Sequence, residues 1–260
     1  MDERAAGRVD EAAVLVDAGR RVVVLSGAGM STASGIPDFR GPKGVWTRNP
    51  DAEKLSSIDH YVADPEVRRR AWLMRLDSPA WRAVPGRGHR ALVHLERRGQ
   101  LDTLVTQNID GLHQEAGTSP ELVVEVHGTI REVVCLSCGW RDVAGPTLDR
   151  VRAGEADPHC LECDGLLKSA TISFGQNLIP DDLQRAFTAA ERCDVLLAVG
   201  STLSVYPIAQ MVPIARNAGA DIVIVNGERT ELDSLASVVV NADLNEALPL
   251  ICGGVAPLPG

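Results

Sequence analysis

The chain has 260 residues, 45% of them apolar, which allows one large domain or a main domain with a smaller one. Its formal net charge of -9 argues against direct nucleic-acid binding, because nonspecific binding to a polyanion requires a basic face. No run of about 18 apolar residues occurs, and the sequence starts with charged residues where a signal peptide is apolar. We therefore expect a cytoplasmic protein without a membrane segment, whose acidic surface tolerates a basic peptide.

The first predicted elements lead into a glycine-rich turn. Residues 9–18 have apolar side chains at helical spacing and stop before a glycine, which suits the end of a helix. Residues 22–25 are four consecutive apolar residues, typical of a short buried strand. The turn that follows contains Gly27 and Gly29 but lacks the third glycine of the usual dinucleotide fingerprint. This pattern predicts a nucleotide-binding crevice that departs from the standard Rossmann motif.

Strands and helices alternate along the rest of the chain, as a parallel sheet requires. Residues 41–88 are interpreted as a helical insertion, and residues 135–163 are so poor in core residues that a bound metal would have to help them fold. The fold class predicted is α/β, a doubly wound parallel sheet interrupted by two insertions. We predict strands at 101–105, 121–126, 171–174, 194–199, 222–225 and 238–240, and helices at 65–75, 89–98, 181–192, 207–217 (kinked or shortened by Pro213) and 245–252.

Polar, glycine-containing sequences follow five of the predicted strands. Taken singly, each is also explained by a tight turn or a helix N-cap. In an open parallel sheet, however, the carboxyl ends of the strands share one edge, and ligands bind there. The five sequences are Gly27-Ala28-Gly29, Gln107-Asn108-Ile109-Asp110, His127-Gly128, Gly200-Ser201-Thr202 and Asn226-Gly227-Glu228.

Four of the six cysteines form two Cys-x-x-Cys pairs, Cys135 with Cys138 and Cys160 with Cys163. Four thiolates in this arrangement suit tetrahedral zinc; redox pairs or unconnected buried cysteines are the alternatives. Because the protein would fill all four positions, the zinc would be structural and the chemistry would lie elsewhere. A zinc ribbon can also bind nucleic acid, but the acidic charge balance disfavours that function.

His127 ends a predicted strand at the same sheet edge as Asn108 and Asp110. A lone histidine at a strand end is more often structural or exposed than catalytic. Here a base, an amide and a carboxylate would converge around one ligand, so these three residues are the candidate catalytic group.

These motifs together resemble the sirtuins of bacterial type, which are NAD-dependent protein lysine deacylases. The resemblance covers about residues 22–249 and keeps the order of the family's motifs. The matching motifs are residues 27–40 (GAGMSTASGIPDFR), 106–113 (TQNIDGLH), His127-Gly128, the paired cysteines, Phe174-Gly175, residues 200–207 (GSTLSVYP) and Asn226-Gly227-Glu228.

The resemblance implies a cleft between a Rossmann-like NAD-binding domain and a smaller domain. The large domain would comprise residues 1–40, 89–127 and 171–260, and the small one a helical insertion (41–88) and a zinc ribbon (128–170). One structural zinc ion would be held by Cys135, Cys138, Cys160 and Cys163. An acyl-lysine peptide would pair as a strand with Phe174, Gly175, Ser204 and Val205. NAD, consumed as a co-substrate, would contact Gly27, Ala28, Gly29, Ser31, Ile36, Asp38, Phe39, Arg40, Gln107, Asn108, Ile109, Asp110, Gly200, Ser201, Thr202, Asn226, Gly227, Glu228 and Leu244.

The family's chemistry implies that the acyl oxygen attacks the ribose carbon of NAD as nicotinamide leaves. His127 would act as general base on a ribose hydroxyl, and the products would be free lysine, nicotinamide and O-acyl-ADP-ribose. Two other hypotheses stay open. One is a protein ADP-ribosyltransferase that uses the same NAD site, and the other is a non-enzymatic, zinc-dependent binding module.

Two departures from the sirtuin pattern leave the peptide edge and the acyl group undetermined. Gln176 stands where sirtuins commonly have an acidic residue after Phe-Gly. In place of the Tyr-x-x-Arg pair that reads acidic acyl groups in one sirtuin class, the chain has Trp72 and Arg75. Arg75 either pairs with a succinyl carboxylate or lies on a solvated helix face.

Overall fold

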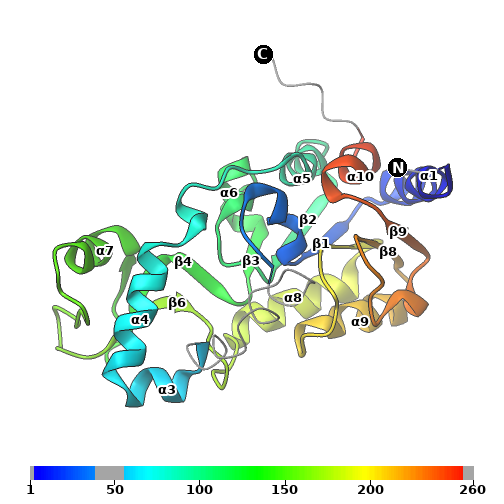
Figure 1. The fold of residues 1–260 in the computed structure, drawn as a ribbon. Coiled ribbons are helices and arrows are strands. Elements are labelled where there is room, and N and C mark those ends of the chain that lie inside the picture. The colour runs from blue at the N-terminus through cyan, green and yellow to red at the C-terminus, as the bar shows by residue number, and fades with distance from the viewer. Residues whose placement is uncertain (1–2, 39–55, 254–260) are drawn as a thin grey trace.

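The computed structural model describes residues 3–38 and 56–253 of the chain. Phe39, Arg40 and the first part of the predicted helical insertion lie outside these residues. The described chain forms a six-stranded sheet and a three-stranded sheet, with helices packed around both (Figure 1).

The large sheet is parallel throughout, with the strand order β3-β2-β1-β7-β8-β9. From β1, the strands β2 and β3 follow in one direction across the sheet. β7 lies on the other side of β1, and β8 and β9 follow it in the opposite direction. The sheet therefore has a switch point between β1 and β7, where open α/β sheets bind ligands. This order confirms the predicted doubly wound fold class. The strands are β1 (Val22–Ser26), β2 (Leu101–Thr106), β3 (Val123–Glu125), β7 (Val195–Val199), β8 (Asp221–Asn226) and β9 (Val238–Asn241).

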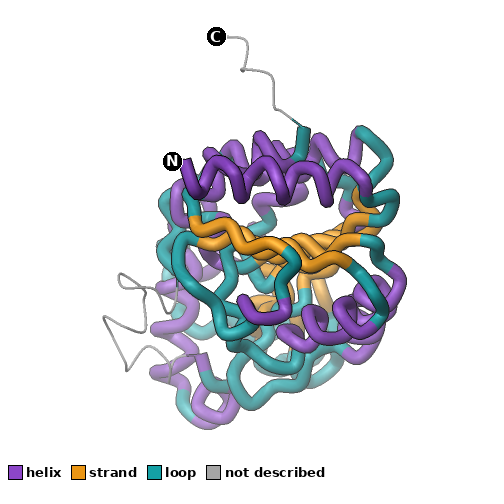
Figure 2. The backbone as a smooth tube through the Cα atoms, turned by 90° about the vertical axis from the view of Figure 1, so that its right-hand side faces the viewer, coloured by secondary structure: helices purple, strands orange, loops and turns teal. Residues whose placement is uncertain are grey.

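Helices cover both faces of the large sheet, because alternate strand residues point to opposite sides. Val22 and Val24 of β1 pack into one apolar cluster, and Val23 and Leu25 pack into the other. The first cluster is closed by α1 (Glu3–Ala18), α5 (Arg87–Arg97) and α10 (Leu244–Ile251), and the second by α8 (Pro180–Arg192) and α9 (Met211–Asn217). Figures 1 and 2 show the sheet between these two helical layers.

The smaller sheet is antiparallel and has the order β5-β4-β6. Its own apolar cluster contains Cys135 and Cys160 and takes Trp72 from a distant part of the sequence. This cluster also uses a helix, α7, that the sequence analysis missed. The elements of this region are α3 (Ile58–Ala63), α4 (Pro65–Leu76), β4 (Gly128–Cys135), β5 (Arg141–Val143), α7 (Ala144–Arg152) and β6 (Leu167–Thr171), and α6 (Leu112–Ala116) lies between β2 and β3 in the sequence.

Two predicted elements differ in the structure. The strand predicted at residues 171–174 is wrong: β6 ends at Thr171, and beyond it Phe174 makes an isolated bridge to Ser57. The apolar residues that pair lie earlier, since Leu167 of β6 lies opposite Cys135 of β4. The helix predicted at 207–217 is shortened, as expected, because Pro213 is tolerated only in the first turn of α9, where no intrahelical N–H bond is needed.

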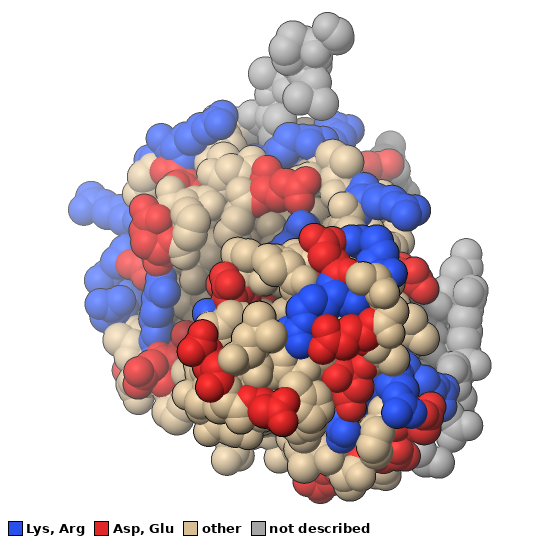
Figure 3. Space-filling model, turned by 90° about the vertical axis from the view of Figure 1, so that its left-hand side faces the viewer, with Lys and Arg blue, Asp and Glu red and all other residues tan. Residues whose placement is uncertain are grey.

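The surface at the α3, α4 and α7 end carries basic and acidic side chains in alternation (Figure 3). This interspersed pattern is unlike the one-signed basic face typical of nucleic-acid-binding proteins. Among the described residues, no helix combines the length and the apolar character needed to cross a membrane.

Candidate functional site

A cavity of about 1380 Å³ opens at the switch point, beyond the carboxyl ends of β1, β2, β7 and β8. Its walls come from the large sheet on one side and from α4, β6 and the segment that follows β6 on the other. Pockets for a single drug-sized ligand occupy roughly 300–1000 Å³, so this one has room for two substrates.

Glycine backbones form the floor of the cavity where β1 and β7 end. Gly29 donates its N–H to Gly200 O at 2.8 Å, and Gly27 donates to Val199 O at 3.0 Å. A Cβ on Gly27 would lie 2.7 Å from Gly200 O, and a Cβ on Gly29 would lie 2.8 Å from Gly200 Cα. Gly200 itself has φ of 62°, a left-handed conformation that disfavours any side chain. The two strand ends therefore touch, and they present bare backbone to a ligand.

A buried polar network lies directly beside these glycines. Asn108 Nδ2 donates to Gly27 O at 3.1 Å and to Ser31 Oγ at 3.2 Å. Ser31 Oγ in turn donates to Asp110 Oδ2 at 2.7 Å, and Asp110 Oδ1 accepts from the backbone N–H of Leu112 at 2.9 Å. All three polar side chains are buried yet line the cavity. The network fixes the amide and the carboxylate against the turn that follows β1.

His127 lines the same cavity at the end of the segment that follows β3. Its Nδ1 lies 3.0 Å from Gln107 O. Because a carbonyl oxygen only accepts, Nδ1 carries the proton and the neutral ring keeps its basic lone pair on Nε2. The side chain of Gln107 is held in turn, because the amide Nε2 of Gln107 donates to Ser201 Oγ at 3.0 Å. This hydrogen bond fixes the tautomer of an imidazole that lines the cavity.

The structure brings almost every predicted site residue to this cavity. Phe39 and Arg40 lie outside the described residues, and Ser204 is not among the lining residues, since its hydroxyl pairs with that of Thr202 at 2.8 Å. The predicted residues that line the cavity are Gly27, Ala28, Gly29, Ser31, Ile36, Asp38, Gln107, Asn108, Ile109, Asp110, His127, Phe174, Gly175, Gly200, Ser201, Thr202, Val205, Asn226, Gly227, Glu228 and Leu244.

The family model described as Sir2 family matches residues 27–207, which span these motifs and the cysteines. The chain belongs to the Sir2 family. A protein from Streptomyces coelicolor named NAD-dependent protein deacetylase 2 is 50% identical over 234 residues, 90% of this chain and 97% of that protein. The NAD-dependent protein deacetylase of Rhodopseudomonas palustris is 42% identical over 234 residues, 87% of this chain and 89% of that protein.

Solved Sir2 structures have the same fold. One, described under the structural basis for the mechanism and regulation of Sir2 enzymes, has a TM-score of 0.86 and 35% identity, and covers 95% of this chain and 96% of its own. A Sir2 variant with a deacetylated p53 peptide and 3'-O-acetyl-ADP-ribose has a TM-score of 0.86 and 32% identity, and covers 95% of this chain and 99% of its own. A Sir2 complex with a p53 peptide and NAD+ has a TM-score of 0.82 and 33% identity, over 92% of this chain and 95% of its own.

The four cysteines of this Sir2 chain come together at the end of the small sheet. Their sulfur atoms all lie within 4.8 Å of one another, with 3.5 Å between Cys135 and Cys163 and 3.8 Å between Cys138 and Cys160. Zinc–sulfur bonds of about 2.3 Å at the corners of a tetrahedron place sulfurs about 3.8 Å apart. The cluster therefore fits one zinc ion with no position left for a reactant, as the sequence predicted.

Two histidines that sequence reasoning left without a role lie buried behind the polar network. The rings of His89 and His113 are 5.0 Å apart. His89 Nδ1 accepts the N–H of Gly86 at 3.1 Å, and His113 Nε2 pairs with Ser26 Oγ at 2.9 Å. Burial lowers the pKa of His89 to about 4 and that of His113 well below its ordinary value, so both rings are neutral near pH 7. Only their depth in the fold reveals them, because nothing in a single sequence distinguishes a buried histidine.

The cavity wall contributed by α3, α4 and β6 also carries residues that the sequence did not single out. Tyr61 and Lys168 both line the cavity, together with Arg75. Lys168 is buried, and its Nζ donates to Thr171 O and, at 3.2 Å, to Ser169 O. Burial, and next the neighbouring Arg75, lower the pKa of Lys168 to about 8. Burial likewise lowers the pKa of Arg75 to about 10. Arg75 is half-buried and lines the cavity, so it does not lie on a fully solvated helix face.

Replacing one ligand, Cys135→Ser, is expected to release zinc and unfold the small sheet, since structural zinc supplies about 10–16 kcal/mol of folding free energy in small zinc modules. Metal analysis and circular dichroism of purified protein test this. Cys193→Ser, which changes a buried cysteine outside the cluster, should keep about one zinc ion per chain. A folded, zinc-free wild-type protein would contradict the assignment.

Acidification should destabilise the fold through His89. The pKa of His89 is about 4 in the folded state, against an ordinary value of 6.5. The neutral ring therefore makes its full contribution to folding stability above pH 6.5, and this contribution decreases as the pH falls toward 4. His89→Gln keeps an acceptor for Gly86 at the third helical position, as in a capping box. Between pH 7 and pH 5 the unfolding free energy of both proteins should decrease. The decrease should be about 2 kcal/mol smaller for the His89→Gln variant than for wild type.

Urea unfolding at the two pH values measures this difference. His94→Gln, in the same helix, is the matched control and should follow the wild-type pH dependence. Equal losses in wild type and His89→Gln would show that His89 is not the group responsible.

Proposed function

We propose that this Sir2 protein is an NAD-dependent protein lysine deacylase of the deacetylase type. It consumes NAD and gives deacylated lysine, nicotinamide and O-acyl-ADP-ribose. The observation that carries the proposal is that His127, Asn108 and Asp110 meet a glycine-lined floor in one cavity at the switch point. The names of the relatives, NAD-dependent protein deacetylases at 50% and 42% identity, support the same reaction.

The floor of the cavity suits the NAD pyrophosphate. The backbone turn from Gly27 to Gly29 carries only the methyl group of Ala28, which lets a phosphate come close to the backbone, and Ser31 adds a hydroxyl to the cavity wall. The far end, with Asn226 and Glu228 at the end of β8, would hold the adenosine. When NAD is bound, its glycosidic bond to nicotinamide supplies the electrophilic carbon for the reaction.

The polar residues near the cavity centre have separate tasks in this proposal. Asn108 and Asp110, locked together through Ser31, position the nicotinamide and its ribose and exclude disordered water from the reacting carbon. His127 takes a proton from a ribose hydroxyl at Nε2, because Nδ1 is engaged with Gln107 O. The four cysteines hold zinc as a structural ion and take no part in proton transfer.

The backbone of Phe174 is already paired on one side. Phe174 already uses its N–H on Ser56 O at 2.8 Å and its C=O on Ile58 N at 3.0 Å. Gln176 uses its side-chain Oε1 to accept the N–H of Ser173 at 3.1 Å. A substrate strand would therefore pair through Gly175, opposite Val205 across the cavity mouth.

The part of the cavity near Arg75 and Lys168 would receive the acyl chain, and its two positive charges favour acidic acyl chains as additional substrates. Arg75 and Lys168 both line it, and among the described residues no carboxylate forms an ion pair with Arg75. Two cations that repel each other in a partly buried wall are stabilised by a bound carboxylate. Trp72 also lines the cavity, but it is buried against the small sheet and serves mainly as a packing residue.

Zinc-binding thiols must stay reduced, so the free cysteines support a cytoplasmic location. The net negative charge of the protein also suits the binding of basic peptide segments of target proteins.

His127→Ala should lower kcat for NAD-dependent deacetylation by about 10²- to 10⁴-fold, the usual contribution of a general base. Nicotinamide release from NAD with an acetyl-lysine peptide measures the rate. The zinc content and the melting temperature of the variant should remain those of wild type. Retention of full turnover would remove His127 from the mechanism.

Arg75→Gln should lower kcat/KM for a succinyl-lysine peptide at least about tenfold more than for an acetyl-lysine peptide, because it deletes a charge-assisted hydrogen bond. Arg70→Gln removes an exposed arginine of the same helix and should leave the ratio unchanged. The proposal for acidic acyl chains is wrong if wild type ignores the succinyl peptide or if both variants give the wild-type ratio.

A further inference from the structure

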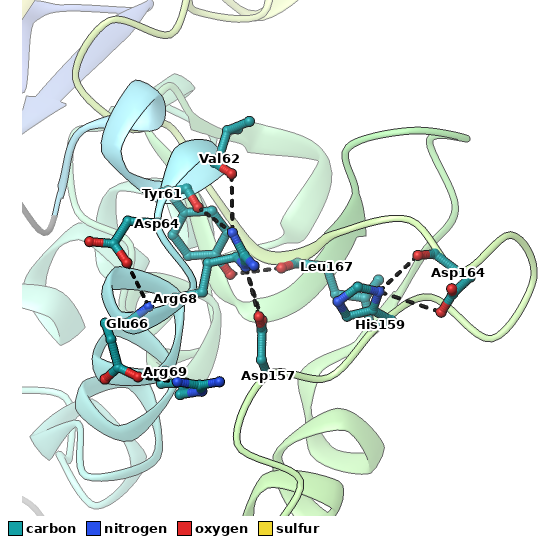
Figure 4. Close-up of polar contacts among 10 residues, drawn as sticks. All are labelled: Tyr61, Val62, Asp64, Glu66, Arg68, Arg69, Asp157, His159, Asp164 and Leu167. Atoms are coloured by element: carbon teal, nitrogen blue, oxygen red, sulfur yellow. Dashed lines mark hydrogen bonds and ion pairs between the residues drawn. The ribbon is translucent and has the colours of Figure 1, made fainter.

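Arg68 is a buried arginine of α4 that takes no part in the cavity lining. Its Nε lies 2.8 Å from Asp157 Oδ2 and 3.1 Å from Oδ1, and the two side chains are 9% and 15% exposed. Its Nη1 donates to Tyr61 O at 3.2 Å and to Val62 O at 3.1 Å (Figure 4). One guanidinium thus binds a carboxylate from one segment and two carbonyls from another. Of the ion pairs among the described residues, this one is the least exposed.

Asp157 belongs to the segment that carries two of the zinc ligands. Cys160 donates its N–H to Gly165 O at 2.9 Å and accepts the N–H of Asp164 at 2.9 Å. His159, next to Cys160, forms a β-bridge with Leu166. Residues 159–166 therefore form one hydrogen-bonded loop that carries Cys160 and Cys163, and Asp157 lies two residues before it.

The other end of the bridge is the cavity wall. Tyr61, whose carbonyl Arg68 binds, lines the cavity and donates its hydroxyl to Leu167 O at 2.7 Å. Lys168, the next residue of β6, also lines the cavity. Arg75 follows Arg68 by about two turns of α4 and lies on the same wall.

A second contact runs in parallel with the ion pair. Trp72, one turn after Arg68 in α4, packs in the apolar cluster that contains Cys135 and Cys160. Because a buried ion pair leaves an uncompensated charge when one partner moves, Arg68 and Asp157 hold these two segments at a fixed separation.

We propose that Arg68 and Asp157 are positioning residues that couple metal binding at the four cysteines to the α3–α4 wall of the cavity. Zinc holds the 159–166 loop, Asp157 just before this loop holds Arg68 of α4, and Arg68 holds the carbonyls of Tyr61 and Val62 in α3. By linkage, an acyl-lysine peptide seated against that wall must in turn slow the loss of zinc. The peptide half of this inference rests on the proposed deacylase function, and the metal half does not.

The first test measures zinc release to a coloured chelator from the folded, zinc-loaded protein. Arg68→Gln, which lies in a different segment from every cysteine, and Asp157→Asn should both release zinc about tenfold faster than wild type. Two variants that each break an exposed ion pair are the matched controls. Arg69→Gln breaks the ion pair with Glu66 in α4, and Glu155→Gln breaks the ion pair with Arg150 just before Asp157 in the sequence. Controls should stay within about twofold of wild type.

Release at the wild-type rate from both Arg68→Gln and Asp157→Asn would overturn the inference. Should Arg68→Gln fail to fold with zinc, Arg68→Lys keeps the charge but loses the planar fork of donors. It should still release zinc at least about threefold faster than wild type, and an unchanged rate would count against the bridge.

The second test adds saturating acetyl-lysine peptide without NAD. The peptide should slow zinc release from wild type about fivefold and from Asp157→Asn less than about twofold. In turnover, Asp157→Asn should raise the peptide KM about tenfold and change kcat less than about threefold, because the wall and not the base is disturbed. Equal slowing by peptide in the two proteins would contradict the coupling. A wild type that releases no nicotinamide with any acyl peptide would refute the proposed function and leave the first test to decide the metal half.

Discussion

The backbones that follow β1 and β7 lie in contact, and no side chain fits between them. Gly27, Gly29 and Gly200 each occupy a position where a Cβ would lie less than 3 Å from the opposing chain. This close approach brings the switch point of the sheet to one spot, and it also places the carboxyl end of β2 beside the same floor through Asn108. The polar network, the orientation of His127 and the shape of the cavity all follow from it.

The second half of the site depends on a different force. The α3–α4 wall is anchored to the cysteine region by Trp72, by Arg68 with Asp157, and by the hydroxyl of Tyr61. Phe174 also holds the start of α3 through its backbone bonds with Ser56 and Ile58. A wall held largely by a neighbouring region depends on that region keeping its fold. A structural metal remote from the chemistry thus bears on substrate binding through ordinary packing and hydrogen bonds.

Sequence reasoning found the parts of the site that are encoded by position along the chain. Glycines and polar residues directly after buried strands, such as Gly200 and Asn108, must meet at one sheet edge once the sheet is parallel, and paired cysteines identify a metal cluster by spacing alone. It missed what depends on depth or on long-range contact: the neutral histidine pair, Lys168 in the cavity wall, and helix α7. The misplaced strand at 171–174 has the same origin, since β6 is specified by its partner β4 and not by its own polar sequence.

We infer that one cavity joins NAD cleavage to acyl transfer from lysine. Mass spectrometry of the products formed from NAD and an acetyl-lysine peptide tests this most directly. Nicotinamide, deacetylated peptide and O-acetyl-ADP-ribose should appear in equal amounts, and each should depend on the presence of both substrates. Nicotinamide release with the acetyl group still on the peptide, and ADP-ribose attached to protein instead, would contradict it.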